Sequence, residues 1–235
     1  MVRLSIKKMR VIEPLTSFHF LQNLLYFPYH EQILPGKINE AIHMKSSNKN
    51  IYILIGGGCH TGHAKTKLVT EIEGWLILKK ITVAKLLFIP FAKDQTDWEK
   101  TLNKYKKSIF SKLLKEKRVS ISTASTNPKT LQGQLLHADI LFFGGGSELN
   151  LKKIFNRRVI PKTDKIIIGT SAGTNFLSKF YFSNDRGMIE AGLGVLPIKT
   201  ICHFSSEKNE KASLLSLKGG PVFPIGDNAY VTLIF

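Results

Sequence analysis

From residue 50 onward, short and wholly apolar runs alternate with longer stretches that mix apolar and polar residues. The apolar runs predict strands at 51–55, 84–90, 119–123, 139–143 and 165–169. The mixed stretches predict helices at 64–79, 97–116, 129–138 and 147–155. Strands that are apolar on both faces and alternate with helices are typical of an α/β protein with a parallel sheet covered on both sides.

Residues 1–49 lack this alternation. They hold "MVRLSIKKMR", an aromatic stretch and "MKSSNKN". We expect an appended N-terminal segment, poorly ordered or packed on the surface, followed by one domain over residues 50–235. A chain of 235 residues with 43% hydrophobic residues is long enough to form one sizeable core.

The net charge of +17 raises nucleic acid as a partner. The densest block of lysines, residues 98–119, also carries an apolar stripe at helical spacing, made by Trp98, Leu102, Tyr105, Ile109 and Leu113. A helix with one buried face and a solvated lysine face explains this block better than a track for phosphates. We therefore expect no specific nucleic-acid partner.

The sequence shows no pattern typical of a membrane-spanning helix, a disulfide framework or a zinc site. No apolar run reaches the roughly 18 residues of a membrane-spanning helix, so we expect no membrane partner. Cys59 and Cys202 are the two cysteines, and neither belongs to a C-x-x-C pair. This usage indicates neither a zinc site nor a disulfide framework and favours a cytoplasmic protein.

The most informative stretch is "IIIGTSAGTNFLS", residues 166–178. A buried strand ends in G-x-S-x-G and a helix-compatible stretch follows, which is the context of a nucleophile elbow. The tight turn would present the side chain of Ser171, and small flanking residues would let neighbouring elements pass closely. The competing interpretation is an ordinary turn in which Ser171 caps a helix.

A nucleophilic serine needs a base and, usually, an acid that orients the base. His203 is the only histidine after Ser171, although a lone histidine in an apolar run is as compatible with a structural role. Asp185 lies in a turn-like stretch and Glu190 competes with it for the role of acid. The carboxylates downstream of the serine are Asp185, Glu190, Glu207, Glu210 and Asp227.

Backbone N–H groups for an oxyanion hole would come from Ala172, directly after the serine, and from the glycine cluster at residues 144–146. Gly145 is the expected second donor, with Gly144 and Gly146 beside the substrate. The same cluster is also compatible with a plain strand-to-helix turn in which Ser147 caps the next helix.

Together, "FFGGGSELNL" (142–151), "GTSAGTNFLS" (169–178), "SNDRG" (183–187), "GLGVLP" (192–197) and "CHF" (202–204) resemble peptidase family S51, which includes peptidase E and cyanophycinase. The segment "KLLFIPFAKDQTDWEKTLNKY" (85–105) also resembles that family.

The resemblance implies a three-layer α/β sandwich of the class I glutamine amidotransferase type. It also implies a serine peptidase without a cofactor that hydrolyses small peptides, such as dipeptides with an N-terminal aspartate. It assigns Ser171 as nucleophile, His203 as base, Asp185 as acid and Asn175 as a substrate contact. Cyanophycinase-like cleavage of a β-aspartyl linkage and an inactive amidotransferase-like binding domain are the alternatives. We expect a monomer or a homodimer.

Two features depart from the family pattern. The chain ends sooner after His203 than is usual in the family, so terminal strands are expected to be missing. The stretch "GGGCHTGHAKT" (56–66) is not a phosphate-binding loop, because His63 stands where such a loop needs lysine. His60 and His63 lack an evident third ligand, so we expect a substrate-contacting loop and no metal site.

Overall fold

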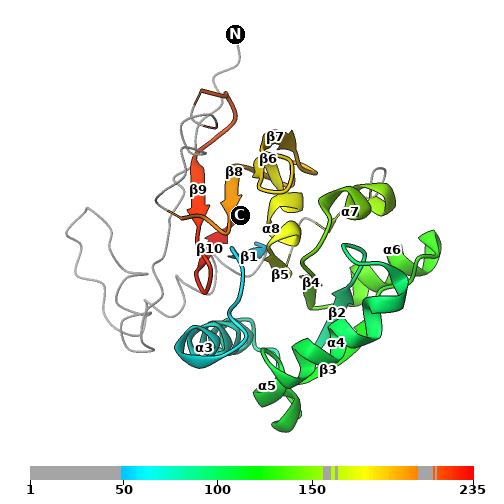
Figure 1. Cartoon of the computed structure of the whole chain (residues 1–235). Coiled ribbons are helices and arrows are strands. Elements are labelled where there is room, and N and C mark those ends of the chain that lie inside the picture. The colour runs from blue at the N-terminus through cyan, green and yellow to red at the C-terminus, as the bar shows by residue number, and fades with distance from the viewer. Residues whose placement is uncertain (1–48, 156–159, 162–163, 206–213, 215) are drawn as a thin grey trace.

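The computed structural model describes residues 49–155, 160–161, 164–205, 214 and 216–235. The expected appended segment therefore lies, except for its last residue, outside the described residues. Within them, the strands form a six-stranded sheet and a four-stranded sheet (Figure 1).

The larger sheet has the order β10-β1-β5-β4-β2-β3. Its members are β1 (Ile51–Ile55), β2 (Ala84–Ile89), β3 (Val119–Thr123), β4 (Ile140–Phe143), β5 (Ile166–Thr170) and β10 (Tyr230–Ile234). All neighbours pair in parallel except β10, which runs antiparallel to β1 at the edge. The five strands expected from the apolar runs are all present, within two residues of the expected bounds.

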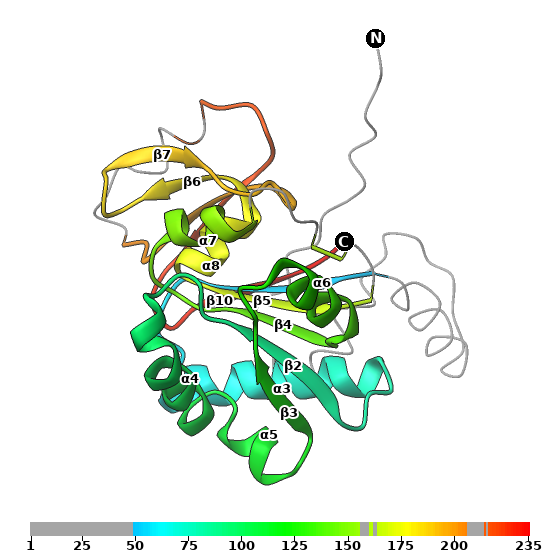
Figure 2. The same ribbon diagram turned by 90° about the vertical axis from the view of Figure 1, so that its right-hand side faces the viewer.

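Helices cover both faces of this sheet, as Figure 2 shows. They are α3 (Gly62–Leu78), η1 (Gln95–Asp97), α4 (Trp98–Lys107), α5 (Ser111–Lys115), α6 (Pro128–His137), α7 (Glu148–Phe155) and α8 (Ala172–Leu177). α3, α4 and α5 lie on one face and α6, α7 and α8 on the other. The fold is the expected α/β three-layer sandwich with a mostly parallel sheet.

Alternating residues along the strands account for these two layers. Ile51, Ile53 and Ile55 belong to the core cluster beneath α3, whereas Tyr52 and Leu54 belong to the cluster beneath α6–α8. All five side chains are buried. An apolar residue at every position is therefore what a strand covered on both faces requires.

The smaller sheet was not expected from the sequence. It has the order β7-β6-β8-β9 and contains β6 (Ser178–Ser183), β7 (Met188–Ala191), β8 (Leu196–Cys202) and β9 (Val222–Ile225). Leu196 and Ile198 of β8 and Phe223 and Ile225 of β9 join the core cluster on the α6–α8 side. This packing brings the ends of β8 and β9 close to the larger sheet.

The helix expected over residues 97–116 is interrupted, and this is a correction. α4 ends at Lys107, Ser108 has non-helical backbone angles (φ −111°, ψ −99°), and α5 begins at Ser111. The break allows Ile109 and Phe110, which are adjacent in sequence, both to be fully buried. Phe110 then packs edge-on against Phe142 of β4, with ring centroids 5.0 Å apart.

The expected apolar stripe nevertheless faces inward. Tyr105, Ile109 and Leu113 are buried. Leu102 is partly buried in the same core cluster, whereas Trp98 packs against the cluster on the opposite face of the sheet. None of the helices within the described residues is long and apolar enough to cross a membrane.

Candidate active site

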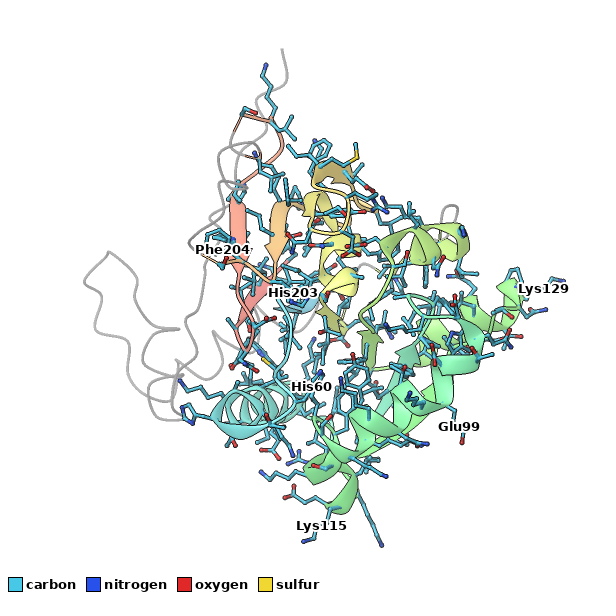
Figure 3. All side chains as sticks on the ribbon, viewed as in Figure 1. His60, Glu99, Lys115, Lys129, His203 and Phe204 are labelled. Carbon is cyan, nitrogen blue, oxygen red and sulfur yellow. The ribbon has the colours of Figure 1, made fainter. Side chains whose placement is uncertain are left out.

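Five strand ends converge on one region. Ser171 follows β5, the glycines 144–146 follow β4, and the glycines 56–58 follow β1. From the smaller sheet, His203 follows β8 and Asp227 comes two residues after the end of β9. Ligand sites of parallel sheets lie at the carboxyl ends of the strands, so this convergence marks the candidate site. Figure 3 shows His203 at the centre of the view.

The backbone of Ser171 has the strained geometry of a nucleophile elbow. Its φ of 51° and ψ of −113° lie outside the usual regions for a residue with a side chain. Its N–H donates to the carbonyl of Ile55 at 2.9 Å, and its own carbonyl accepts from the Asn175 N–H at 3.0 Å. These bonds hold the serine between β1 and α8, and the Ser171 side chain makes no capping hydrogen bond to that helix.

The two flanking glycines are required by close packing. A Cβ on Gly169 would lie 2.8 Å from the backbone nitrogen of Thr174. A Cβ on Gly173 would overlap the carbonyl of Phe143, at the end of β4. The turn can be this tight because neither position carries a side chain.

Ser171, His203 and Asp227 form a continuous hydrogen-bonded relay. The Ser171 Oγ lies 2.8 Å from His203 Nε2, and His203 Nδ1 lies 2.6 Å from Asp227 Oδ1. A carboxylate can only accept, so it fixes the hydrogen on Nδ1 and leaves Nε2 free to accept from the serine hydroxyl. This is the geometry in which a serine can transfer its proton to a base.

This geometry favours a different carboxylate from the expected acid, Asp185. Asp185 is exposed in the turn between β6 and β7, and the carboxylate at His203 belongs to Asp227. The competing candidate, Glu190, bonds instead to Arg186 and to the Tyr181 hydroxyl, the latter at 2.9 Å. The other downstream carboxylates, at positions 207 and 210, lie outside the described residues.

The relay is accessible from solvent. The side chains of His203 and Asp227 are 45% and 61% exposed. Ser171 is partly buried. A small substrate can therefore reach the serine, and the His203–Asp227 pair is partly screened by water.

The two expected oxyanion donors border the serine. Ala172 is the first residue of α8, so its N–H has no partner within the helix. A Cβ placed on Gly145 would lie 3.4 Å from the Ser171 Cβ and 4.0 Å from its Oγ, which places Gly145 beside the serine side chain. The Gly145 N–H also interacts with the Tyr105 hydroxyl; burial raises the pKa of Tyr105, and this interaction partly offsets the increase. A substrate oxygen would compete with that hydroxyl for Gly145.

The other two glycines of the cluster fasten the end of β4 to the end of β2. The Gly144 N–H donates to the carbonyl of Ile89 at 3.1 Å. Gly146 has a φ of 144°, and a Cβ there would overlap the Ala92 carbonyl. These contacts hold Gly145 in place beside Ser171.

Asn175 lies in the interior of the protein. Its side-chain amide donates to Glu148 at 2.9 Å, and its oxygen accepts from the Thr200 hydroxyl at 3.0 Å. Asn175 and Glu148 are both more than nine-tenths buried. Because both ends of the amide are used inside the protein, this placement favours a link between α7, α8 and β8 over the expected substrate contact.

The loop after β1 brings His60 against Tyr105, with ring centroids 5.5 Å apart, while His63 is exposed. Burial lowers the pKa of His60, and the nearby Lys104 adds to this effect. In the part of the chain that the structure describes, no three His, Cys, Asp or Glu side chains gather as ligands for a metal ion.

Comparison with known protein families identifies the family of this chain. The model of peptidase family S51 matches residues 52–233, which is most of the chain. The chain belongs to peptidase family S51. Membership in this family supports a peptidase and therefore a hydrolase.

Among the solved structures that match is that of a peptidase from an acI-B1 Actinobacterium. The match has a TM-score of 0.54 and 15% sequence identity, and covers 77% of this S51 chain and 82% of the other. At that identity the likeness supports the fold alone. No curated protein matches this chain significantly.

Proposed function

We propose that this S51 protein is a serine peptidase that hydrolyses small peptides through an acyl-enzyme on Ser171. The observation that carries the proposal is the hydrogen-bonded relay from Ser171 through His203 to Asp227. The strained elbow supports it, because strained backbone at a reactive side chain is typical of functional sites.

The reaction follows from these positions. His203 Nε2 takes the proton of the Ser171 hydroxyl while Oγ attacks the peptide carbonyl, and Asp227 stabilises the imidazolium that forms. The N–H groups of Ala172 and Gly145 stabilise the oxyanion of the tetrahedral intermediate. His203 then gives the proton to the leaving amine, and the C–N bond breaks.

Water completes the cycle. His203 Nε2 takes a proton from a water molecule, whose oxygen attacks the acyl carbon. The second tetrahedral intermediate collapses, Ser171 Oγ regains the proton from His203, and the carboxylic acid product leaves. The overall reaction consumes one water for each peptide bond and needs no oxidant or cofactor.

The substrate class that we propose is a dipeptide with an N-terminal aspartate. The support is the resemblance to the aspartyl dipeptidases of family S51, together with the net charge of +17, which favours anionic substrates through long-range attraction. The second candidate is cleavage of a β-aspartyl linkage, which would use the same relay on a displaced carbonyl.

Two experiments test the reaction. A fluorophosphonate probe should label Ser171 in the folded protein, and Ser171→Ala should lose both labelling and turnover. Replacing Ser171 and His203 together should be little worse than either change alone, because the two groups act as a unit. A Ser171→Ala variant with undiminished peptide hydrolysis would remove Ser171 as the nucleophile. A folded wild-type protein that shows neither labelling nor turnover would leave the inactive binding domain as the better interpretation.

The substrate is tested with Asp-Leu, Glu-Leu, Asn-Leu and β-Asp-Leu. We expect the highest kcat/KM on Asp-Leu. A preference for β-Asp-Leu would select the second candidate. Equal values on all four would remove the aspartyl assignment and leave the serine peptidase in place.

A further inference from the structure

The glycine run Gly56–Gly58 at the end of β1 lies directly against the loop that carries Asp227. Gly57 and Asp227 form an isolated parallel β-bridge. The Asn228 N–H donates to the Gly57 carbonyl at 2.8 Å, and the Gly56 N–H donates to the Ala229 carbonyl at 3.1 Å. Two segments about 170 positions apart in the sequence are thus joined at the aspartate and at the two residues that follow it.

The Asn228 side chain adds a third hydrogen bond between these two segments. Its side-chain oxygen accepts from the Cys59 N–H at 2.9 Å. Asn228 and Cys59 both have left-handed backbone, each with a φ of 58°. Asparagine adopts this conformation more readily than most residues. The side-chain bond therefore holds the loop at a fixed distance from the end of β1.

The absence of a side chain at position 57 makes room for the His203–Asp227 pair. A Cβ on Gly57 would lie 2.5 Å from His203 Nδ1 and would overlap Asp227 Oδ1. These are the two atoms joined by the 2.6 Å hydrogen bond. The α-carbon of Gly57 therefore lies against that bond and limits where the imidazole and the carboxylate can meet.

We propose that Gly57 is a positioning residue for the His203–Asp227 pair and that Asn228 locks the loop on which this pair depends. The proposal rests on the proposed function, because it concerns the base and the acid of that reaction. The glycine run Gly56–Gly58 fits neither a phosphate-binding loop nor a metal site, and this proposal gives it a role.

The neighbours of Gly56 and Gly57 differ in a way that makes the proposal testable. A Cβ on Gly57 meets the ends of two partly exposed side chains, which can move aside. A Cβ on Gly56 overlaps the backbone carbonyls of Ile225 and Gly226, which cannot move without displacing the chain. Gly57 also lacks a positive φ, so alanine fits its backbone. Gly57→Ala should therefore fold but displace the pair, whereas Gly56→Ala should lower stability.

The principal test is Gly57→Ala, assayed on the best dipeptide substrate. We expect kcat to fall about 10- to 100-fold with little change in KM, because a displacement of about 1 Å in the reacting groups can cost 10²-fold. The melting temperature should stay close to that of the wild type. Gly133→Ala is the matched control: Gly133 lies in α6, nothing lies within 4 Å of a Cβ there, and kcat should not change.

A double-mutant cycle separates positioning from general damage. In the Asp227→Ala background, Gly57→Ala should change kcat by less than about twofold, since the pair that it displaces is already broken. If the two losses multiply instead, Gly57 acts independently of Asp227 and the proposal is overturned.

Proton NMR gives a readout that does not depend on turnover. The His203 Nδ1–H, bonded to Asp227, should give a downfield resonance in the wild type that disappears in Asp227→Ala and shifts or disappears in Gly57→Ala. The two ideas can fail separately. If the resonance shifts in Gly57→Ala while Ser171→Ala keeps full hydrolysis, the positioning role is upheld and the proposed function is rejected. An unshifted resonance with unchanged kcat would reject the positioning.

If Gly57→Ala does not fold, Asn228→Gly replaces it. Glycine tolerates the left-handed φ, so this change removes the bond to the Cys59 N–H without adding strain. We expect a smaller loss of kcat than for Gly57→Ala and a broadened or shifted Nδ1–H resonance. Wild-type kcat together with a wild-type resonance in this variant would overturn the proposal.

Discussion

Asp227→Asn is the sharpest perturbation of the proposed mechanism. The Asp227 carboxylate lies 2.6 Å from His203 Nδ1 and can only accept a hydrogen bond, so it holds the hydrogen on that nitrogen. An asparagine has nearly the same shape but can present its NH₂ group instead. In that orientation the ring hydrogen moves to Nε2, which can then no longer accept the proton of Ser171.

The magnitude follows from the exposure of the pair. In a buried triad, replacing the acid by its amide lowers kcat by about 10⁴. Asp227 is 61% exposed, so water screens its charge and competes for both groups, and the full effect is not expected. We expect kcat to fall by about 10²–10³, equivalent to about 3–4 kcal/mol of transition-state stabilisation.

The assay is steady-state hydrolysis of the best dipeptide, with Asp185→Asn as the matched control. The control removes the carboxylate that is nearer in sequence to Ser171 but exposed in the β6–β7 turn. We expect kcat of the control within about twofold of the wild type, as for a surface change away from the reacting groups. If Asp185→Asn is the damaging change and Asp227→Asn is mild, the reasoning from the hydrogen-bonded relay is refuted.

Two further predictions concern groups around the site. Burial raises the pKa of the Cys59 thiol to about 11, with Asp227 adding to the effect, and burial also raises the pKa of Cys202. Neither cysteine should react with iodoacetamide at pH 7–8 until the protein unfolds; rapid labelling of the folded protein, read by mass spectrometry, would contradict this. Burial raises the pKa of Glu190, but hydrogen bonds from Tyr181 and Arg186 outweigh it, so the pKa lies below its ordinary value. A carboxyl group whose pKa is lower in the folded state than in the unfolded state stabilises the fold at pH values above its unfolded-state pKa. This stabilisation is lost as the pH falls through the folded-state pKa. Glu190→Gln should thus lower the melting temperature at pH 7 and have a diminishing effect below about pH 4; an equal effect at both pH values would contradict it.

The elements of the larger sheet were predictable because their signals are local. Apolar runs of only four or five residues that are rich in β-branched or aromatic residues favour strands covered on both faces, and β1, β4 and β5 are each fully buried. The elbow was predictable for the same reason: Gly169 and Gly173 flank Ser171 within five residues, and the close contacts that require them form within that turn or with the adjacent β4. Parallel strands place ligand sites at their carboxyl ends, and this rule predicted that the serine and the glycine clusters lie close together.

Local patterns could not show the break at Ser108 or the interior position of Asn175. The break depends on Phe110 packing against Phe142, which comes from a strand 32 positions further along the chain. Asn175 stands four residues after Ser171, so its spacing suits a substrate contact as well as a buried link. Its hydrogen bonds to Glu148 and Thr200, which only the tertiary structure shows, favour the buried link.

The sequence by itself therefore determined the strand-helix alternation, the proposed nucleophile Ser171 and the only histidine downstream of it. The tertiary structure decided which carboxylate completes the relay. Asp185 is closer to Ser171 along the chain, yet β9 and the bridge to Gly57 deliver Asp227 to the imidazole. The physical reason is that a hydrogen bond depends on distance in space, and here that distance is set by pairing between segments about 170 residues apart.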